Sequence, residues 1–231
     1  MRGINVFRSR DVNAPLPPFY VARPNPDYSQ IRQIESSADL ESHSLEVALR
    51  GNVTRFFNGI AQYTLSRAYN SVGGARGINT FPADNWNLNG EWARADFDAR
   101  HRLNLLGNIK PGKGFNLGIA LALNSGMPYS LTTGRDDNHD GLANDRPAGV
   151  PRNSLQGPGY AGLDLRWSRD FFLVKSKREK GPAITPALDA FNILNRVNYV
   201  GYVGNLSSPF FGKPVAANPP RRLQLSVRFR F

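Results

Sequence analysis

The chain has 231 residues, carries a formal net charge of +11 and contains no cysteine. This length suffices for one β-domain of ordinary size, and the lack of cysteine excludes disulfide frameworks and the usual thiolate zinc sites. The charge suggests nucleic acid or an anionic membrane surface as a partner, but the basic residues are spread along the chain, with one dense run at 175–180. Nucleic acid is therefore the less favoured partner.

The first three predicted strands lie in the N-terminal part of the chain. They are indicated by apolar and polar residues that alternate with a period of two, which is typical of a strand with one apolar and one polar face. The strands cover about 3–10, 41–50 and 55–66, and a short turn at 51–54 joins the second to the third. A long loop, about 67–96, follows.

Three more strands are predicted at about 97–109, 115–125 and 160–173. A tight turn at 111–114 joins the first two, whereas a long loop at 126–159 precedes the third. The strand at 115–125 is the most regular, because its apolar residues alternate with small or polar ones without interruption. Its polar face carries Gly, Ala and Asn rather than the Lys, Glu and Thr of a water-exposed sheet, which suits a polar lumen.

Two strands are predicted in the C-terminal part, at about 182–195 and 221–231. A short charged turn at 174–181 precedes the first, and a loop at 196–220 separates the two. Pro186 interrupts the first strand and cannot donate a ladder hydrogen bond, so we expect an edge strand or a bulge there.

The terminal strand and the loop lengths favour lipid over a protein core. The last nine residues alternate throughout and end on Phe231, and a transmembrane β-strand needs ~9–11 residues. An aromatic residue at this end suits the interfacial girdle of an outer-membrane barrel, and so do connections that alternate between long and short. The sequence therefore predicts an all-β fold, an antiparallel transmembrane β-barrel to which this chain contributes about eight strands.

A series of short motifs carries a family resemblance. The motifs include Asn13-Ala14-Pro15-Leu16-Pro17, Asp98-Ala99-Arg100-His101-Arg102-Leu103, Ser125-Gly126-Met127-Pro128-Tyr129, Asn144-Asp145-Arg146-Pro147, Asp189-Ala190-Phe191-Asn192-Ile193-Leu194-Asn195 and Phe211-Gly212-Lys213-Pro214. Each motif is weak by itself, but in this order the chain resembles the C-terminal portion of Oar-like TonB-dependent receptors of the bacterial outer membrane.

The resemblance implies a barrel of the 22-stranded type, whose lumen is filled by a separate plug domain. Residues 1–231 would then be the C-terminal part of that barrel, and we expect the signal peptide, the plug and the TonB box to be absent from them. The implied function is energised transport of an unidentified bulky solute. The chain is expected to be a fragment that is unable to transport by itself.

The implied location is the bacterial outer membrane, and the implied partners follow from it. They are outer-membrane lipid and lipopolysaccharide, the remaining strands and plug of the full-length receptor, and TonB only through the missing N-terminal part. No nucleic acid and no cofactor is expected, apart from the calcium considered below. The resemblance also makes Phe229 and Phe231 the expected signal for the membrane-insertion machinery.

The sharpest local motif is an acidic loop that could hold calcium. Asp136, Asn138 and Asp140 precede Gly141 in the pattern of the first half of an EF-hand loop. The closing Glu of that loop is absent, and Asn144 or Asp145 could supply a substitute oxygen. The alternative is a solvated loop stabilised by Asx turns, which needs no metal.

No constellation in the sequence indicates an enzyme. His43, His101 and His139 are scattered without partners at metal-ligand spacing, and no nucleophile elbow or phosphate-binding glycine motif occurs. A network of ion pairs in the lumen is expected from charged residues on the polar faces, namely Asp98, Arg100, Arg102, Asp164 and Arg166.

Three functions stay open at this point. The first is a segment of a TonB-dependent receptor or transporter. The second is a small structural or adhesive outer-membrane barrel whose loops bind calcium. The third, less favoured, is a basic soluble β-protein that binds nucleic acid.

Overall fold

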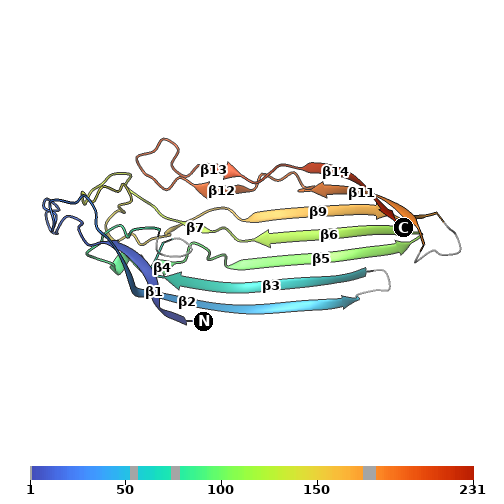
Figure 1. Cartoon of the computed structure of the whole chain (residues 1–231), viewed down its shortest axis with the longest axis horizontal. Helices are drawn as coiled ribbons and strands as arrows, with labels where there is room; N and C mark the ends of the chain where they lie inside the picture. The colour runs from blue at the N-terminus through green and yellow to red at the C-terminus, as the bar shows by residue number, and fades with distance from the viewer. Residues whose placement is uncertain (1, 53–56, 74–78, 174–180) are drawn as a thin grey trace.

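The structure, a computed structural model, describes residues 2–52, 57–73, 79–173 and 181–231. Within them the chain forms one antiparallel sheet of ten strands and two small two-stranded sheets (Figure 1). The long strands are β1 (Arg2–Asp11), β2 (Arg32–Asn52), β3 (Phe57–Asn70), β5 (His101–Gly112), β6 (Phe115–Asn124), β9 (Tyr160–Arg169), β11 (Ala183–Phe191) and β14 (Arg222–Arg230). The predicted all-β architecture with about eight long strands is confirmed.

The strand order follows the chain, and the sheet is open. Neighbours run β1–β2–β3–β5–β6–β9–β11, and β11 also pairs with β14 and with the short strand β10 (Phe171–Phe172). The short strand β4 (Ala93–Arg94) pairs with β3. Among the described residues, the outer edges of β1 and β14 have no further strand beside them. Each edge therefore presents unpaired backbone groups that need a partner in lipid.

The connections are sorted onto two ends of the sheet (Figure 1). The described parts of the long loops lie at one end, and the turn between β5 and β6 lies at the other, together with the C-terminus. The described parts of the long loops contain a 3-10 turn (Asn89–Glu91) and two small two-stranded sheets, β7 (Pro128–Tyr129) with β8 (Leu155–Gln156) and β12 (Tyr199–Tyr202) with β13 (Pro214–Ala217). The predicted charged run at 175–180 lies outside the described residues.

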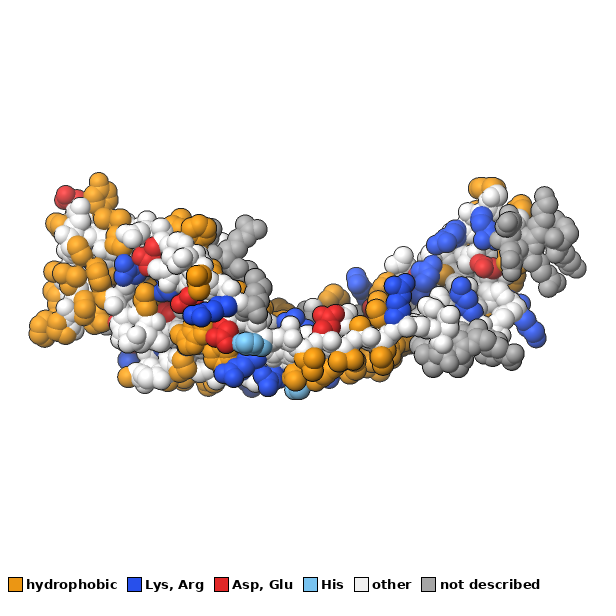
Figure 2. All heavy atoms as spheres, turned by 90° about the horizontal axis from the view of Figure 1, so that it is seen from below, with side chains coloured by type: hydrophobic (Ala, Val, Ile, Leu, Met, Phe, Trp, Pro, Cys, Tyr) orange, Lys and Arg blue, Asp and Glu red, His pale blue; other side chains and the backbone are white. Residues whose placement is uncertain are grey.

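The register places apolar side chains on one face of the sheet. Leu103 of β5 lies opposite Tyr63 of β3 and Leu123 of β6, and Leu105 lies opposite Ala61 and Leu121. The sheet is bowed, with the apolar residues on its convex side and charged residues along the concave side (Figure 2). Leu225, at 82% exposure, shows that no protein core covers the convex face at β14. The two-face assignment of the predicted strands is confirmed.

Strand β2 is about twice as long as predicted, because it begins at Arg32 rather than near residue 41. Its first half is largely polar and pairs with β1 from Arg2↔Glu41 to Asp11↔Arg32. A period-two apolar pattern detects only the part of a strand that has an apolar face. The extension beyond the apolar band was therefore invisible in the sequence.

The prediction of an edge at Pro186 is wrong, because β11 lies in the interior of the sheet. It pairs with β14 over its whole length and with β9 from Ala187 to Ala190. Pro186 instead marks an interruption on the other side, where the partner of β11 changes from β9 to β10 at Ile184. A proline fits there because no ladder bond from its nitrogen is needed.

The turn between β5 and β6 depends on a glycine. Gly114 has a φ of +77°, and its carbonyl accepts a hydrogen bond from the Asp170 amide at 2.9 Å. A Cβ at this position would come within 2.7 Å of the Asp170 carbonyl oxygen. Glycine therefore permits both the left-handed turn and the close contact with the end of β9.

No helix within the described ranges is long and apolar enough to cross a membrane.

The face assignment predicts unequal effects of the same substitution at two adjacent residues. Leu225→Arg places a charge on the convex face, where an arginine near the bilayer midplane costs ~2–4 kcal/mol. Ser226→Arg places it on the concave face opposite Ala187. We expect the first variant to be depleted from isolated outer membranes and the second to be inserted normally. Equal insertion of both variants would contradict the assignment.

Candidate functional site: the concave face and the loop layer

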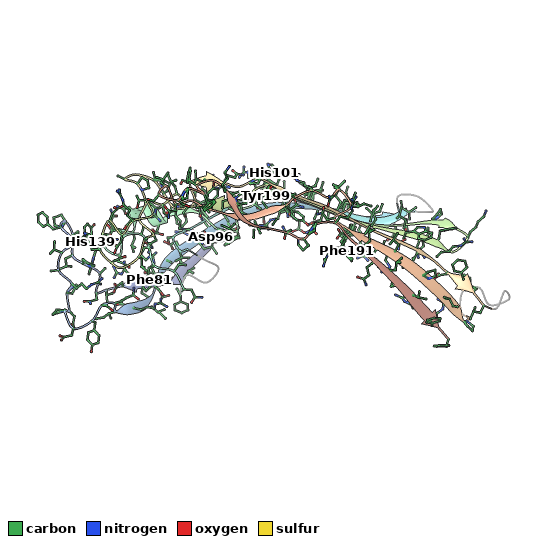
Figure 3. The ribbon with its side chains drawn as sticks, turned by 90° about the horizontal axis from the view of Figure 1, so that it is seen from above. Phe81, Asp96, His101, His139, Phe191 and Tyr199 are labelled. Atoms are coloured by element: carbon green, nitrogen blue, oxygen red, sulfur yellow. The ribbon has the colours of Figure 1, made fainter. Side chains whose placement is uncertain are left out.

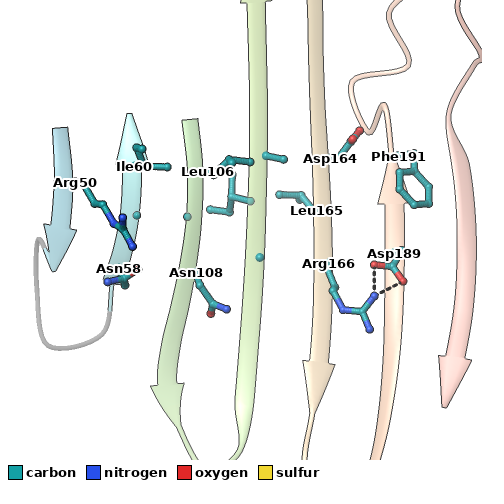
Figure 4. A pocket seen from close by; sticks show the side chains of 15 residues that line it. Arg50, Asn58, Ile60, Leu106, Asn108, Asp164, Leu165, Arg166, Asp189 and Phe191 are labelled. Atoms are coloured by element: carbon teal, nitrogen blue, oxygen red, sulfur yellow. Dashed lines mark hydrogen bonds and ion pairs between the residues drawn. The ribbon is translucent and has the colours of Figure 1, made fainter. Parts of the chain in front are cut away.

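The concave face carries two adjoining hollows, which are the candidate site. The larger, of about 550 Å³, spans β2 to β11 and is lined by residues including Arg50, Asn58, Asn108, Arg166 and Asp189 (Figure 4). The second, of about 290 Å³, lies nearer the short turns and shares Asn108 and Arg166 with the first. Phe191 lies on this concave side and His101 on the opposite, convex side (Figure 3). The hollows therefore face away from the apolar surface.

One ion pair lies between the two hollows. The Nη1 atom of Arg166 on β9 lies 2.8 Å from each carboxylate oxygen of Asp189 on β11 (Figure 4). The register brings them together, because Arg166 pairs directly with Asp189. Each strand thus contributes one charged side chain, and the pair keeps the guanidinium in position above the sheet.

The ion-pair network predicted for the polar faces does not form as expected. Asp98 binds Arg94 at 2.9 Å, and Arg102 donates to the Phe97 carbonyl at 2.8 Å. Asp164 accepts a hydrogen bond from the Asn192 amide at 2.7 Å instead of pairing with Arg166. These side chains lie at different positions along the strand direction. The alternation of faces in the sequence does not specify those relative positions, because they depend on register.

Cations gather on the concave face near the short turns (Figure 2). The smaller hollow is lined by Lys110, Arg166, Arg228 and Arg230 but by a single acidic residue, Asp170. Asp170 accepts a hydrogen bond from the Thr185 hydroxyl at 2.6 Å. Because Arg166 is paired elsewhere, the other three cations give this end of the face an excess of positive charge that suits an anionic surface or solute.

A buried group of charges, here called the loop cluster, ties the long loops together. Glu91 binds both Arg146 and Arg152, and Arg152 also binds Asp96 at 2.8 Å and the Asn70 carbonyl at 3.0 Å. The side chains of Glu91, Arg146 and Arg152 are 4%, 11% and 7% exposed. Burial lowers the pKa of Arg152, while Asp96 and Glu91 act to raise it. The cluster joins two long loops that are distant in sequence to the end of β3.

The acidic loop directs its oxygen atoms at its own backbone. Asp136 accepts hydrogen bonds from the amides of Asp140 and Gly141, and Asp145 accepts from the amide of Asp137 at 2.7 Å. The Asn138 side-chain oxygen also accepts from the Asp140 amide. Within the described ranges, no three His, Cys, Asp or Glu side chains are arranged to hold a metal ion. The geometry fits the Asx-turn alternative, and calcium binding stays a prediction.

Two carboxyl groups of this loop titrate abnormally. Burial raises the pKa of Asp140 to about 6, and the negative charges of Asp136 and Asp145 add to the shift. The pKa of Asp145 is also raised, chiefly by burial. Asp140 accepts a hydrogen bond from the Leu142 amide at 2.9 Å, which lowers the pKa and opposes the shift only in part. It also accepts one from the Asn85 side chain at 3.0 Å.

The predicted insertion signal lies at the short-turn end of the sheet. Phe229 is on the convex face of β14, opposite Ile184, and is 61% exposed. Phe231 follows the last strand residue and is fully exposed. Their role in insertion stays a prediction.

Sequence reasoning missed the residues that assemble across strands and loops. The Arg166–Asp189 pair and the cations of the smaller hollow come from strands up to 120 residues apart, such as Lys110 and Arg230. The only sequence signal for the loop cluster is that Arg146 and Arg152 lie inside the family-like motifs Asn144-Asp145-Arg146-Pro147 and Arg152-Asn153-Ser154. No local spacing links these residues, because register and loop packing bring them together.

The sequence matches the family described as outer membrane beta barrel domain over residues 1–151. This match covers more than half of the 231 residues. It agrees with the strand pattern and with the apolar convex face. No curated protein matches the sequence.

Three solved structures share the fold at low sequence identity. The outer membrane transporter YddB from Escherichia coli has a TM-score of 0.64 at 10% identity and covers 98% of this chain. The FpvA structure from P. aeruginosa, bound to a pyoverdine, has a TM-score of 0.53 at 10% identity over 90% of the chain. The ferric-catecholate import receptor Fiu from E. coli K12 has a TM-score of 0.51 at 12% identity, and the match covers 84% of this chain.

These neighbours are TonB-dependent receptors, the group that the motifs resemble. At such identities the likeness shows the fold. The chain spans 28% of the YddB structure and 22% of each of the other two.

The loop cluster predicts a large effect from the loss of one buried charge. Glu91→Gln leaves Arg146 and Arg152 without a shared partner, and breaking a buried pair costs about 3–5 kcal/mol. Asp137→Asn is the control, since its pair with Arg135 is exposed and such pairs contribute about 1 kcal/mol or less. We expect trypsin to cleave the loops of the first variant much faster than those of the control. Similar cleavage rates would show that the cluster does not hold the loops.

The acidic loop predicts a stability that rises as the pH falls. Because the folded-state pKa of Asp140 is about 6, above its ordinary value of 3.8, the folded loop holds a proton between these pH values that the unfolded loop has lost. Stability is therefore lowest above pH 6 and increases toward pH 4. Hydrogen exchange of peptide 136–145, corrected for intrinsic rates, is expected to be slower at pH 5 than at pH 7.

Two controls accompany the exchange measurement. Asp140→Asn removes the titrating group and is expected to leave only the weaker dependence due to Asp145. Millimolar calcium at pH 7 tests the metal prediction in the same experiment, because a bound cation would slow exchange as acid does. An exchange rate that is independent of pH in the wild type would contradict the assignment to Asp140.

Proposed function

Because this chain belongs to the family of outer membrane beta barrel domains, we propose that it is one segment of the barrel of a TonB-dependent receptor that transports a bulky solute. The chain is a protein of the bacterial outer membrane, which leaves the soluble nucleic-acid-binding alternative without support. In the proposed orientation the long loops lie outside the cell and the short turns face the periplasm. The solute itself stays unidentified.

The main support for this proposal is that the sheet is open, with an unpaired strand at each edge. Eight long strands with two unpaired edges cannot lie in lipid as they are, since each unpaired backbone group there costs several kcal/mol. Strand β2 makes the requirement concrete, because β1 pairs with it only up to Glu41 and leaves residues 42–52 without a partner on that side within the described chain. Further strands on both sides would complete a barrel.

The concave face supplies the second support. The smaller hollow is lined by asparagine, serine, threonine and charged residues, which suit a hydrated lumen, and the larger one combines Arg50, Asn58 and Asn108 with apolar residues such as Ile60 and Leu106, which suits the surface of a plug domain. The cations Lys110, Arg228 and Arg230 lie on this face near the periplasmic end. We infer that they meet an acidic surface of the plug or an anionic solute that passes it. Contact with TonB would be made through that plug, outside residues 1–231.

Site-specific photocrosslinking tests the proposal. A benzoylphenylalanine in place of Asn108 points into both hollows, and we expect it to form an adduct with protein segments outside residues 1–231. The matched control is the same substitution at Leu105, three residues away on the convex face of β5. The control is expected to give adducts with lipid alone, and mass spectrometry of the adducts identifies the partner peptides.

Two results would contradict the receptor assignment. Adducts at Asn108 confined to residues 1–231 would indicate a small barrel that closes on itself, which is the structural or adhesive alternative. Adducts at Asn108 with lipid would show that the concave face is not a lumen.

A further inference from the structure

A small cavity lies beside Arg8 at the long-loop end of the sheet, the end where Phe81 and Asp96 also lie (Figure 3). The residues that line it include Arg8 on β1, Ser71 directly after β3, and Glu91 in the following loop. Its volume is about 10 Å³, which leaves room for about one water-sized particle. The cavity is separate from the two hollows of the concave face and adjoins the loop cluster through Glu91.

The Arg8 side chain is buried with two of its donor atoms unused. Arg8 is 6% exposed, and its Nη2 atom donates to the Ser37 carbonyl and to the Ser71 hydroxyl, both at 3.0 Å. Its Nε and Nη1 atoms are buried and have no hydrogen-bond partner among the described residues. Buried polar groups are nearly always hydrogen-bonded in folded proteins, so these two N–H groups require an acceptor.

The neighbouring carboxylates do not supply that acceptor. Glu35 forms its ion pair with Arg10, and Glu91 forms its ion pairs inside the loop cluster. Asp39 is exposed, and solvent screens its charge. These three carboxylates act on Arg8 only through space, and burial still lowers the pKa of its guanidinium. Arg8 therefore carries a buried positive charge without a paired counter-ion in the described chain.

The polar groups around the cavity offer donors. The Ser71 hydroxyl oxygen accepts from Arg8 and from the Asp39 amide at 2.9 Å, whereas its own proton has only a 3.5 Å contact with the Asp39 carbonyl. That proton and the two N–H groups of Arg8 can therefore be donated to a particle in the cavity. Glu91, the carboxylate in the lining, is already bound to two arginines. A particle that only accepts hydrogen bonds fits these surroundings better than water, which must also donate.

The charge of the surrounding groups also favours an anion. Arg8, Arg146 and Arg152 contribute three positive charges, and Glu91 and Asp96 contribute two negative ones. The difference is one positive charge, which a monovalent anion would balance. The small volume of the cavity excludes oxyanions such as sulfate and phosphate.

We propose that this cavity binds a single chloride ion through Nε and Nη1 of Arg8 and the hydroxyl of Ser71. The planar guanidinium presents neighbouring N–H groups in a fixed geometry, which suits the shared coordination of one anion. The bound ion links the edge strand β1 to the end of β3 and to the loop that carries Glu91. This inference goes beyond the proposed function and does not depend on it.

Hydrogen exchange of the complete outer-membrane protein tests the site in solution. Peptides covering 2–11 and 79–91 are compared in sodium chloride and in sodium gluconate at equal ionic strength. A ligand that binds only the closed state slows exchange through opening by a factor of 1 + [Cl⁻]/Kd, which is about tenfold when chloride is at about ten times Kd. We expect this slowing to saturate with chloride and to be absent in gluconate.

Bromide locates the ion directly. Crystals of the complete protein in sodium bromide are expected to show one anomalous scattering peak in the cavity, next to the Arg8 guanidinium. This measurement uses the wild-type chain and therefore does not depend on the folding of any variant.

Variants connect the effect to the cavity. Arg8→Gln removes the charge and the guanidinium donors and is expected to abolish the effect of chloride, whereas Arg8→Lys keeps the charge without the planar donor pair and should weaken it. Arg10→Gln is the matched control, because Arg10 lies two residues away on β1 and binds Glu35 instead of lining the cavity. Heat-modifiable migration checks folding, and Ser71→Ala, which should lower chloride affinity, decides the case if Arg8→Gln does not fold.

Three results would overturn the chloride site. The first is equal exchange in chloride and gluconate, which would show that the cavity holds water alone. The second is an equal chloride effect in Arg8→Gln and Arg10→Gln. The third is a bromide peak without chloride-dependent exchange, which would indicate binding at crystal concentration only. The crosslinks at Asn108 report on a different surface, so their outcome is independent of all three.

Discussion

The structure depends on the requirement that every backbone N–H and C=O group in a bilayer be hydrogen-bonded within the protein. The antiparallel ladders from β1 to β14 meet this requirement in the interior of the sheet, where even Pro186 sits at a point that needs no bond from its nitrogen. They do not meet it at the two edges. Pairing of both edges is therefore the physical condition under which this sheet can occupy a membrane.

The alternation of side chains gives the two faces of the sheet different chemical characters. The convex face presents apolar side chains to its surroundings. The concave face offers a larger hollow of mixed polar and apolar lining and a smaller one whose cations lie near the turn between β5 and β6. Adjacent residues such as His101 and Arg102 therefore lie on opposite faces of the sheet.

The long loops are held together by buried charged groups that bind one another. The segments around residues 91, 96, 146 and 152 have little apolar material to bury, and their buried charges bind one another instead. A second link joins the loops at 132 and 204, where the Thr132 amide donates to the Gly204 carbonyl at 2.9 Å. These contacts give the sheet a structured outer end, on which the acidic loop with its proton-sensitive Asp140 is displayed.

The sequence by itself determined the strand positions and the two faces of each strand, because a pattern with a period of two encodes both. It placed the strand at 115–125 almost as observed for β6, assigned the convex and concave faces and sorted the loops onto two ends, because alternation and turn residues are local properties. Only the tertiary structure decided the polar half of β2, the interior position of β11 and the Arg166–Asp189 pair. These depend on register, which sets residues distant in sequence side by side and which no local spacing specifies.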